Sequence, residues 1–300
     1  MPLWPDDLAP GVTTVVADGV TRVVAPNPGV MTGPGTNTYA VGTSSVVLID
    51  PGPDDDRHYD RLLELYGDRI RALLVTHSHL DHSPLARRLS EATGATVVGF
   101  GPAPQASLHG AGGHHFDGHD QGFAPDRRMS DGERFDVGDF ALDAVWTPGH
   151  TSNHLCFELA GTGLLFSGDH VMSGSTVVIA PPDGDMSAYF DSLEKVRRRA
   201  LRRIGPGHGA MIDDPGAVLD GYLRHRRQRE AQVAACLAEA GPDGVSVGAL
   251  VERIYTDVPS ALHPVARYSV WAHLRKLLGD GLATSPEPDD IDATWSPSQG

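Results

Sequence analysis

The segment Thr76 to His82, THSHLDH, has the residue types and the spacing of a metal site. It supplies four metal-ligating side chains within a short stretch, namely His77, His79, Asp81 and His82. On extended backbone the i, i+2 spacing places His77 and His79 on one face, and the following turn directs the other two toward a neighbouring point. So many donors in one loop suit two adjacent divalent metals better than one. A solvated His-rich loop is the alternative, and the apolar strand predicted just before this segment disfavours it.

Three further donors stand where other strands or helices are expected to end. They are His150 in TPGHTSNH, Asp169 in FSGDH and His208 in GPGHG. The first two follow the apolar runs DAVWT and GLLF, whereas His208 follows a predicted helix and a single apolar residue. A Gly or Pro turn beside each donor would expose it at the end of its element. The sequence therefore predicts that these three residues join the THSHLDH segment in one metal centre.

Short strands and helices alternate along the first hundred residues, as in layered α/β proteins. Strands are expected in the β-rich runs between residues 12 and 50, at 71–76 and at 95–100, and helices over 58–67 and 84–93. Residues 101–130 break the pattern with a Gly- and Pro-rich loop that contains His109, His114, His115 and His119. Loops of this length are usually functional or flexible. Two interpretations stay open, a lid over the metals or a mobile loop, and none of these histidines is assigned as a ligand.

Strands resume at 140–147, 154–159 and 163–168, and a helix is expected over roughly 186–203. After Asp214 the chain becomes mostly helical, with helices predicted over 217–240, 246–256 and 263–281 and then a short hairpin. Three helices and a terminal hairpin of this size are typical of a winged helix. We expect two domains, a catalytic one over residues 1–222 and a winged-helix-like one over 223–300.

The ligand pattern resembles that of the metallo-β-lactamase superfamily, over most of residues 20–210. The resemblance implies an α/β fold, a four-layer αββα sandwich, here followed by the small, mostly helical C-terminal domain. It implies a first metal bound by His77, His79 and His150, a second bound by Asp81, His82 and His208, and Asp169 bridging both. Two zinc ions are the expected cofactors, with manganese or iron as alternatives.

Further roles follow from the same resemblance. Asp50, in LIDPG, would hold the metal-binding segment by hydrogen bonds, and Thr76 and Thr151 are the other polar side chains expected behind the ligands. Asp81 is expected to be catalytic, because it would orient a hydroxide held between the two metals. True β-lactamases carry a cysteine where this chain has Asp169, which disfavours antibiotic hydrolysis as the main activity.

Substrate contacts are predicted for three side chains on weaker grounds. Asn37 and Tyr39 follow a Gly-Pro turn in GPGTNTYAVG, which would expose them near the pocket. An ordinary first hairpin explains the same residues equally well. His154 follows His150 at helical spacing, and a structural histidine is the alternative to a substrate contact.

The C-terminal segments GHGAMIDDP and YLRHRRQRE and the Trp-bearing helix resemble the beta-lactamase-like-protein-2 group of this superfamily. Animal members of that group look like single-stranded RNA endonucleases. Related fungal enzymes are thioesterases that release chains from carrier proteins, and the glyoxalase-II branch cleaves glutathione thioesters. The resemblance thus implies a dinuclear hydrolase and leaves its substrate open.

Charge weighs against nucleic acid as the substrate. The chain has 24 Lys and Arg against 39 Asp and Glu, a formal charge of −15. Two basic runs, residues 196–203 and 224–229, would steer an anionic substrate if both faced the metals, but a solvated helix face is the favoured interpretation. No aromatic residues interleave with these runs to stack on bases.

The leading hypothesis is a dizinc hydrolase whose metal-bridging hydroxide attacks a thioester or related acyl group, either small or carrier-linked. A single-stranded RNA endoribonuclease with the same metals is the alternative. A non-catalytic winged-helix regulator with a relic metal site is the third, which the intact ligand set disfavours. The absence of a signal sequence and of a long apolar run, with only two cysteines, predicts a cytoplasmic protein without a membrane partner. The winged-helix-like domain is interpreted as a packing module or the basis of a homodimer.

Overall fold

The structure is a computed structural model that describes residues 4–104 and 118–298. Its first sheet runs from antiparallel strands at one edge to parallel strands at the other. In order the strands are β1 (Thr13–Ala17), β2 (Val20–Val24), β3 (Asn37–Val41), β4 (Val46–Ile49), β5 (Ile70–Leu74), β6 (Thr96–Gly99) and β7 (Arg127–Arg128). The strands from β4 to β7 are parallel, so their carboxyl ends share one edge of the sheet.

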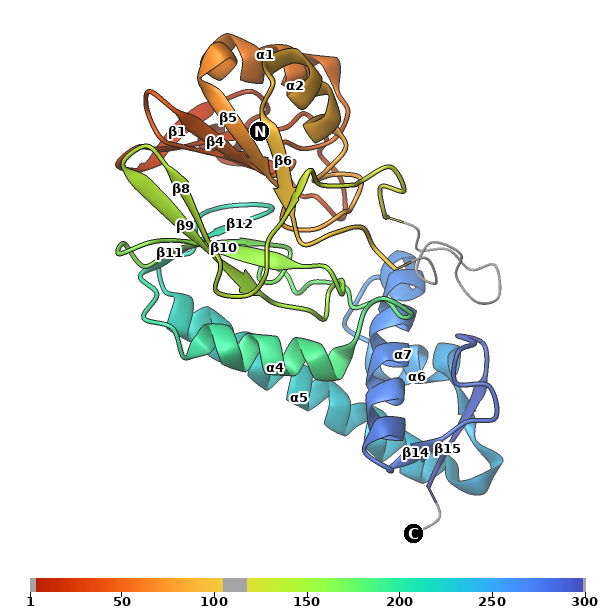
Figure 1. Cartoon of the computed structure of the whole chain (residues 1–300). Helices are drawn as coiled ribbons and strands as arrows, with labels where there is room; N and C mark the ends of the chain where they lie inside the picture. The colour runs from red at the N-terminus through yellow and green to blue at the C-terminus, as the bar shows by residue number, and fades with distance from the viewer. Residues whose placement is uncertain (1–3, 105–117, 299–300) are drawn as a thin grey trace.

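A second sheet packs face to face on the first (Figure 1). Its strands are β8 (Arg134–Val137), β9 (Phe140–Trp146), β10 (Leu155–Leu159), β11 (Leu164–Gly168) and β12 (Arg203–Pro206), in the order β12-β11-β10-β9-β8. All neighbours are antiparallel except β11 and β12, which are parallel. The carboxyl ends of β11 and β12 therefore meet at one edge, as those of β4 and β5 do in the first sheet.

Helices cover the outer face of each sheet, which gives the four layers of an αββα sandwich (Figure 1). The first sheet carries α1 (Asp56–Tyr66) and α2 (Leu85–Thr93), and the second carries α4 (Met186–Arg197) and α5 (Pro215–Ala240). One buried cluster fills the space between the sheets, and Ile49, Leu74, Phe157 and Phe166 belong to it. Separate clusters lie under the helices of each face, so every layer is joined to the next by burial of apolar surface.

Helix boundaries follow from local chemistry. The Asp55 carboxylate accepts hydrogen bonds from the first amides of α1, and Asp214 does the same for α5, which then begins with Pro215. Gly94 ends α2 in the left-handed conformation that glycine adopts at low cost. Short 3-10 turns occur at η1 (Asp6–Leu8), η2 (Gly67–Arg69), η4 (Gly241–Asp243) and η5 (Ser260–Leu262).

The helix expected over 186–203 is shorter than the sequence suggests. It ends at Arg197, and the run from Arg203 to Pro206 forms strand β12 instead. The segment is rich in good helix formers, so propensity alone extends the helix. Pairing with β11 overrides that preference because it buries Ile204 completely beside Leu165. His208 thus follows a strand, not a helix. Because β12 is parallel to β11, His208 lies beside Asp169.

The C-terminal part has its own buried core and lies beside the sandwich, in blue in Figure 1. It contains α6 (Val247–Ile254), α7 (His263–Gly279) and the small sheet β13 (Val245–Ser246), β14 (Ala283–Thr284) and β15 (Thr294–Pro297), with β15 in the middle. Helix α5 contacts both α4 of the sandwich and the helices of this part. Since α5 runs unbroken past residue 222, the domain boundary at 222/223 stays a prediction. Among the described residues no helix is long and apolar enough to cross a membrane.

Candidate metal centre

Parallel strand pairs bring distant residues of the sequence to one site. Asp50 directly follows β4, and the THSHLDH segment follows the neighbouring parallel strand β5. In the second sheet, Asp169 follows β11 and His208 follows β12, its parallel neighbour. His150 comes from the turn after β9. The predicted ligands therefore converge at facing edges of the two sheets, where ligand sites of open α/β sheets commonly lie.

The first cluster of donors, called here the three-histidine group, consists of His77, His79 and His150. The Nε2 atom of His77 lies 2.9 Å from Nδ1 of His79, which lies 3.1 Å from Nε2 of His150. All three nitrogen atoms lie within 4.8 Å of one another. Such separations let one ion contact all three atoms at the usual metal–nitrogen distance of about 2 Å.

Hydrogen bonds behind this group fix which ring nitrogens face inward. The Thr76 hydroxyl donates to Asp50 and so accepts from Nδ1 of His77, at 3.0 Å. Nδ1 of His150 donates to the Val178 carbonyl oxygen at 2.8 Å. In both rings Nε2 is then a bare acceptor aimed at His79, so at most one proton can lie among the three inward nitrogen atoms. A divalent cation is the group that satisfies all three lone pairs, and the residues therefore fit a metal.

The second cluster, called here the Asp/His group, consists of Asp81, His82, Asp169 and His208. Nε2 of His208 lies 3.1 Å from an Asp81 oxygen and 3.3 Å from Nε2 of His82. Nδ1 of His82 donates to Asp50 at 2.9 Å, and Nδ1 of His208 donates to the Gly35 carbonyl oxygen at 3.2 Å. Here too both imidazoles turn their Nε2 atoms inward, beside two carboxylates.

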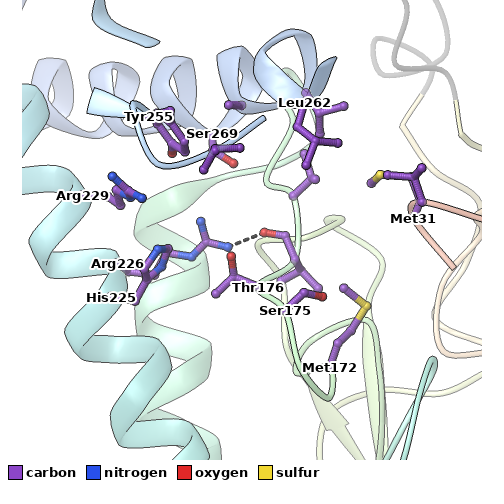
Figure 2. Close-up of a pocket in the computed structure, with 16 residues that line it drawn as sticks. Met31, Met172, Ser175, Thr176, His225, Arg226, Arg229, Tyr255, Leu262 and Ser269 are labelled. Carbon is purple, nitrogen blue, oxygen red and sulfur yellow. Dashed lines mark hydrogen bonds between the residues drawn. The ribbon is translucent and has the colours of Figure 1, made fainter. Parts of the chain in front are cut away.

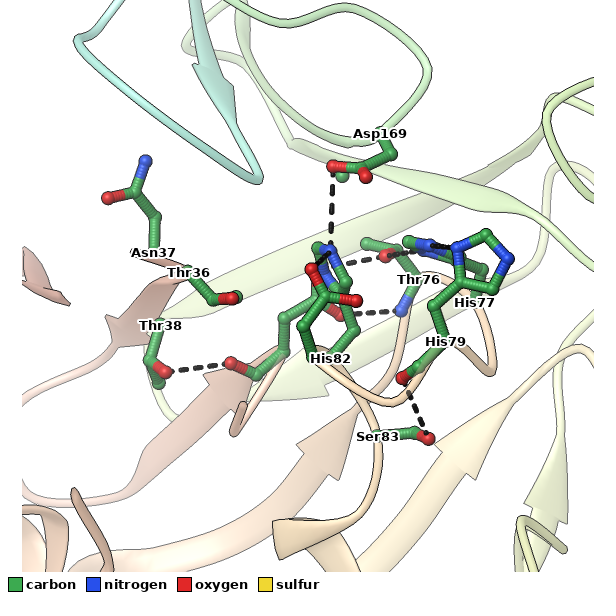
Figure 3. Close-up of polar contacts among 12 residues, drawn as sticks. Thr36, Asn37, Thr38, Thr76, His77, His79, His82, Ser83 and Asp169 are labelled. Carbon is green, nitrogen blue, oxygen red and sulfur yellow. Dashed lines mark hydrogen bonds and ion pairs between the residues drawn. The ribbon is translucent and has the colours of Figure 1, made fainter. Parts of the chain in front are cut away.

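Asp169 lies between the two groups. Its Oδ1 atom is 3.5 Å from Nε2 of His82 and 3.4 Å from Nε2 of His208, while Oδ2 is 3.8 Å from Nε2 of His150. Figure 3 shows it facing the histidines of the THSHLDH segment from a separate loop. Each oxygen thus faces one group, which is the geometry a bridging ligand needs.

Asp50 connects the two groups from behind. One oxygen accepts from the Thr76 backbone amide at 2.8 Å, and the other accepts from the Thr76 hydroxyl and from Nδ1 of His82. Its backbone has a φ of 51°, a left-handed conformation that Asp tolerates better than most residues. Through Thr76 it orients His77, so a single carboxylate sets a ligand of each group, as the sequence predicted for Asp50 and Thr76.

The two groups differ in their electrostatics. In the three-histidine group, burial and the neighbouring histidines hold the pKa of His77 and His79 well below the usual range, which favours neutral rings. In the Asp/His group, burial alone would lower the pKa of the histidines, but the carboxylates outweigh it. They raise the pKa of His208 to about 9 and that of His82 well above its usual value. The same pairing lowers the pKa of Asp81 and Asp169 against the effect of burial.

A cavity of about 280 Å³ opens over both groups, and we call it the metal cavity. Its lining residues are Met31, Thr32, His79, Leu80, Asp81, Gly118, His150, Asp169, Met172, Val177, Val178 and His208. The lining combines inward ligands with apolar walls. Asp81, with 27% of its side chain exposed, is the most accessible member of the Asp/His group.

Gly207 allows the close approach of the two sheets. A Cβ atom there would lie 2.5 Å from Oδ1 of Asp169 and 2.8 Å from a ring carbon of His82. Any larger residue would therefore displace ligands of the Asp/His group. Gly207, the middle glycine of GPGHG, is therefore needed for packing, whereas the sequence pattern indicated only a turn.

The side chains predicted to touch substrate lie elsewhere. Asn37 and Tyr39 are buried and donate to the Pro206 carbonyl oxygen, each at 2.9 Å, so they hold the loop that carries His208. His154 is fully buried behind the site, where its ring stacks on His77. None of the three lines the metal cavity. The prediction of substrate contact is corrected to a supporting position, because the Gly-Pro turn leads into a buried strand.

Thr151 supports the ligands indirectly, through Asn153. Its hydroxyl donates to the Asn153 side chain, whose amide nitrogen donates to Ser78 and to the Gly101 carbonyl oxygen. Thr151 therefore braces the segment between His77 and His79 instead of touching a ligand side chain. Asn153 and Ser78 were not singled out by the sequence.

His119 is the histidine that brings the described part of the long loop to the site, next to Gly118 in the cavity wall. It is 7% exposed, its Nδ1 contacts Ser78 at 3.0 Å, and its Nε2 lies 3.3 Å from Asp183. Its ring centroid is 4.8 Å from that of His79. For His119 the structure replaces both sequence interpretations, lid and mobile loop, with a packed supporting position. His109, His114 and His115 lie outside the described residues.

The two basic runs do not face the metal cavity. Within them, ion pairs with nearby carboxylates occupy Arg197, Arg199, Arg203, Arg227 and Arg229. In the C-terminal part, Arg267, Arg275 and Lys276 are also ion-paired. No member of the two runs lines the metal cavity. The expected solvated helix face does not describe Arg226, which is buried.

Comparison with known proteins defines the class. The sequence profile of the metallo-beta-lactamase superfamily matches residues 31–208, and that of the beta-lactamase associated winged helix domain matches residues 246–295. The chain belongs to the metallo-beta-lactamase superfamily and is a hydrolase with this fold, followed by a winged helix. The predicted fold class and family are thereby confirmed.

Relatives are similar over almost the whole chain. The chain is 30% identical to a beta-lactamase-like protein 2 homolog of Drosophila melanogaster, over 97% of this chain and 98% of that one. It is 31% identical to an atrochrysone carboxyl ACP thioesterase of Aspergillus fumigatus, over 82% of this chain and 76% of that one. Among solved structures, a beta-lactamase domain protein of Burkholderia ambifaria superposes with a TM-score of 0.79 at 20% identity, over 98% and 97% of the two chains. The last similarity concerns the fold alone.

Proposed function

We propose that this chain is a dinuclear metal hydrolase that cleaves a thioester or a closely related acyl substrate. The observation that carries the proposal is the convergence of seven donor side chains into two adjacent groups beneath one cavity. Asp169 faces both groups, which favours a pair of ions over a single one.

The chemistry of the donors favours zinc. His77, His79 and His150 would hold one ion and Asp81, His82 and His208 the other, with Asp169 between them. Neutral imidazoles suit zinc, and the added carboxylates leave manganese and iron as alternatives. Two such ions would supply an activated water and polarise the scissile carbonyl.

The chain's own residues would supply orientation and a dry environment. Asp81 lines the metal cavity and is accessible, so its carboxylate would accept a hydrogen bond from the attacking water and hold it in line. Met31, Leu80, Met172, Val177 and Val178 would exclude bulk water from the reacting atoms and pack on an apolar acyl group. Asp50 would keep the ligand rings in place during turnover.

Two observations support an acyl substrate. A relative over most of the chain is named for thioesterase activity on a carrier-linked acyl group. The metal cavity has apolar walls, and among the described residues that line it there is no arginine or lysine. A phosphodiester would be expected to meet cationic or aromatic side chains near the reacting phosphorus.

The proposal is tested with metal-loaded full-length protein, a panel of thioesters and a labelled single-stranded RNA. We expect cleavage of thioesters with about two equivalents of zinc per chain, and loss of both bound metal and cleavage in His77→Ala. Asp213→Ala, a change at an exposed carboxylate, is the control and should behave like the wild type. Cleavage of RNA alone would overturn the acyl substrate. If no substrate is cleaved and His77→Ala changes only the thermal stability, hydrolase activity is excluded.

Residence in the cytoplasm and a homodimer stay predictions.

A further inference from the structure

A second cavity of about 260 Å³ adjoins the metal cavity, and we call it the distal cavity. It lies between the segment 172–178, helix α5 and the start of α7, so the sandwich and the winged helix both contribute to it (Figure 2). Met31, Met172, Val177 and Val178 line both cavities. The two spaces therefore share one wall, and together they extend from the metal centre to the winged helix.

The lining of the distal cavity is mostly apolar. Beyond the shared wall it includes Val30, Tyr255, Val258, Leu262, Val265 and Ala266. Apolar side chains are unusually exposed beside the two cavities. Val30, 81% exposed, lines the distal cavity, Leu80, 51% exposed, lines the metal cavity, and Met31, 42% exposed, lines both. Exposed apolar residues are normally scattered, and their presence in the walls of two joined cavities indicates a surface that an apolar ligand covers.

A buried cation lies on the α5 side of the distal cavity. Figure 2 shows Arg226 and Arg229 on α5, across the cavity from Met31 and Met172. Arg226 is only 2% exposed, and one of its N–H groups donates to the Val177 carbonyl oxygen. Its Nε has no hydrogen-bond partner, and no carboxylate among the described residues pairs with it.

The guanidinium of Arg226 lies over the Tyr189 ring, 5.3 Å from its centroid. A buried cation without a carboxylate partner is still costly, because it loses its hydration. The nearby Arg229 is only loosely neutralised, with Asp257 at 3.7 Å. Ser175, Thr176 and Ser269 add hydroxyl groups to the same lining. The α5 side of an otherwise apolar cavity is therefore suited to an anionic oxygen group.

From this geometry we infer that the distal cavity binds the acyl portion of the substrate, and that this portion is an apolar chain ending in a carboxylate that pairs with Arg226. The inference rests on the proposed function, because it places the scissile carbonyl in the metal cavity. It makes the winged helix part of the substrate site, since η5 and α7 supply Leu262, Val265, Ala266 and Ser269. The reaction is hydrolysis, in which the C–S bond breaks, water supplies the acyl oxygen and the thiol leaves with a proton.

The test compares three N-acetylcysteamine thioesters, of acetic, octanoic and octanedioic acids, on metal-loaded full-length protein. We expect kcat/KM to rise from acetyl to octanoyl because the cavity buries methylene groups, by about tenfold or more. A further rise of about tenfold is expected for the octanedioyl thioester, because its free carboxylate reaches Arg226. Equal kcat/KM for all three would overturn the inference while leaving the proposed hydrolase intact.

Paired variants locate the effect in the distal cavity. Ala266→Trp fills the cavity and should lower the octanoyl-to-acetyl ratio of kcat/KM about tenfold, whereas Ala231→Trp, on the exposed face of α5, should not change the ratio. Arg226→Gln should abolish the preference for octanedioyl over octanoyl, and Arg226→Lys should retain part of it. Arg224→Gln, exposed on the same helix, is the matched control. Unchanged ratios in both Ala266→Trp and Arg226→Gln would exclude the assignment.

A binding measurement separates this inference from the proposed function. Octanedioate and octanoate are titrated into the metal-loaded wild type and into Arg229→Gln. This variant keeps the buried Arg226 and removes one cation from the lining of the distal cavity. Tighter binding of octanedioate that weakens in Arg229→Gln supports the distal cavity even if no thioester is cleaved. Equal binding of both acids to the wild type overturns the carboxylate end of the inference.

Discussion

The two donor groups of the metal centre are built from similar residues but solve opposite electrostatic problems. In the three-histidine group, the hydrogen bonds of His77 and His150 turn bare nitrogen atoms toward His79. Within that group no carboxylate is present to hold a proton on the rings. In the Asp/His group, the carboxylates of Asp81 and Asp169 raise the pKa of their histidine partners.

This difference in electrostatics indicates which donor group depends more on a bound cation. Converging lone pairs gain nothing from one another, so the three-histidine group is arranged for an ion and for little else. The Asp/His group can balance its own charge by protonating His82 and His208, at the cost of competition between protons and metal. Asp169 and Asp50 are the two side chains that couple the groups.

The largest effect is expected from breaking both groups together. Asp169→Ala removes the one oxygen pair that faces His150 on one side and His208 on the other. We expect hydrolysis to fall on the order of 10³-fold and bound metal to fall below about two equivalents, measured by steady-state kinetics and elemental analysis. Asp213→Ala, a carboxylate 78% exposed, is the control. Wild-type metal content in Asp169→Ala would contradict a bridging role.

Breaking one group at a time should cost less and should leave the other ion in place. His150→Ala removes a ligand of the three-histidine group, and His208→Ala removes one of the Asp/His group. Each should retain about one equivalent of metal and lose on the order of 10²-fold in kcat/KM. Because protons compete more strongly in the Asp/His group, metal retained by His150→Ala should be lost more readily at low pH than metal retained by His208→Ala. The same pH dependence in both variants would refute the contrast.

A change at Asp50 should weaken both groups equally without touching an ion. Asp50→Asn replaces a carboxylate that accepts from the Thr76 amide, the Thr76 hydroxyl and His82. An amide cannot accept all three with the same strength, and we expect metal affinity to fall about 10–100-fold, measured by chelator competition. Asp54→Asn, on the exposed surface and ion-paired with Arg88, serves as the reference. Loss of one ion alone would mean that Asp50 does not couple the groups.

The smallest effect should be confined to the three-histidine group. His119→Ala removes the ring that packs on His79 and contacts Ser78 and Asp183. We expect metal affinity to fall by less than about tenfold, since no ligand is lost. Asn37→Ala, which loosens the loop that carries His208, should instead weaken the Asp/His group. Stepwise metal titration by calorimetry distinguishes the two, and identical titration curves would show that the groups share one support.

Most of the residues of the metal centre could be predicted from the sequence. The THSHLDH segment and the donors at 150, 169 and 208 lie in motifs that combine ligand types with turns, and the structure brings all seven donors together. Asp50 and Thr76 were predicted to lie behind the ligands from the resemblance to the superfamily, and both hydrogen-bond there. The predicted strands and helices before residue 170 match closely in position, since their apolar periodicity agrees with their burial.

The errors share one physical cause, which is that contacts distant in sequence override local pattern. The run of good helix formers after Arg197 leads into strand β12 and does not extend the helix, because β11 offers a parallel partner. Asn37, Tyr39 and His154 became supports because the loops they follow turn inward. His119 carries no motif at all, and only the path of the chain across the site brings it to His79.

The sequence by itself predicted the donor side chains that the structure brings together, because ligand type and spacing are local properties that need no tertiary information. It also determined the family, and with it the four layers and the winged helix. Only the tertiary structure decided how charge is shared between the two donor groups, since pKa shifts depend on burial and on neighbours from other strands. It alone revealed that α5 and α7 close a cavity against the segment 172–178, with Arg226 buried in its wall. Cavities and unpaired charges arise from packing between distant segments, which no local pattern encodes.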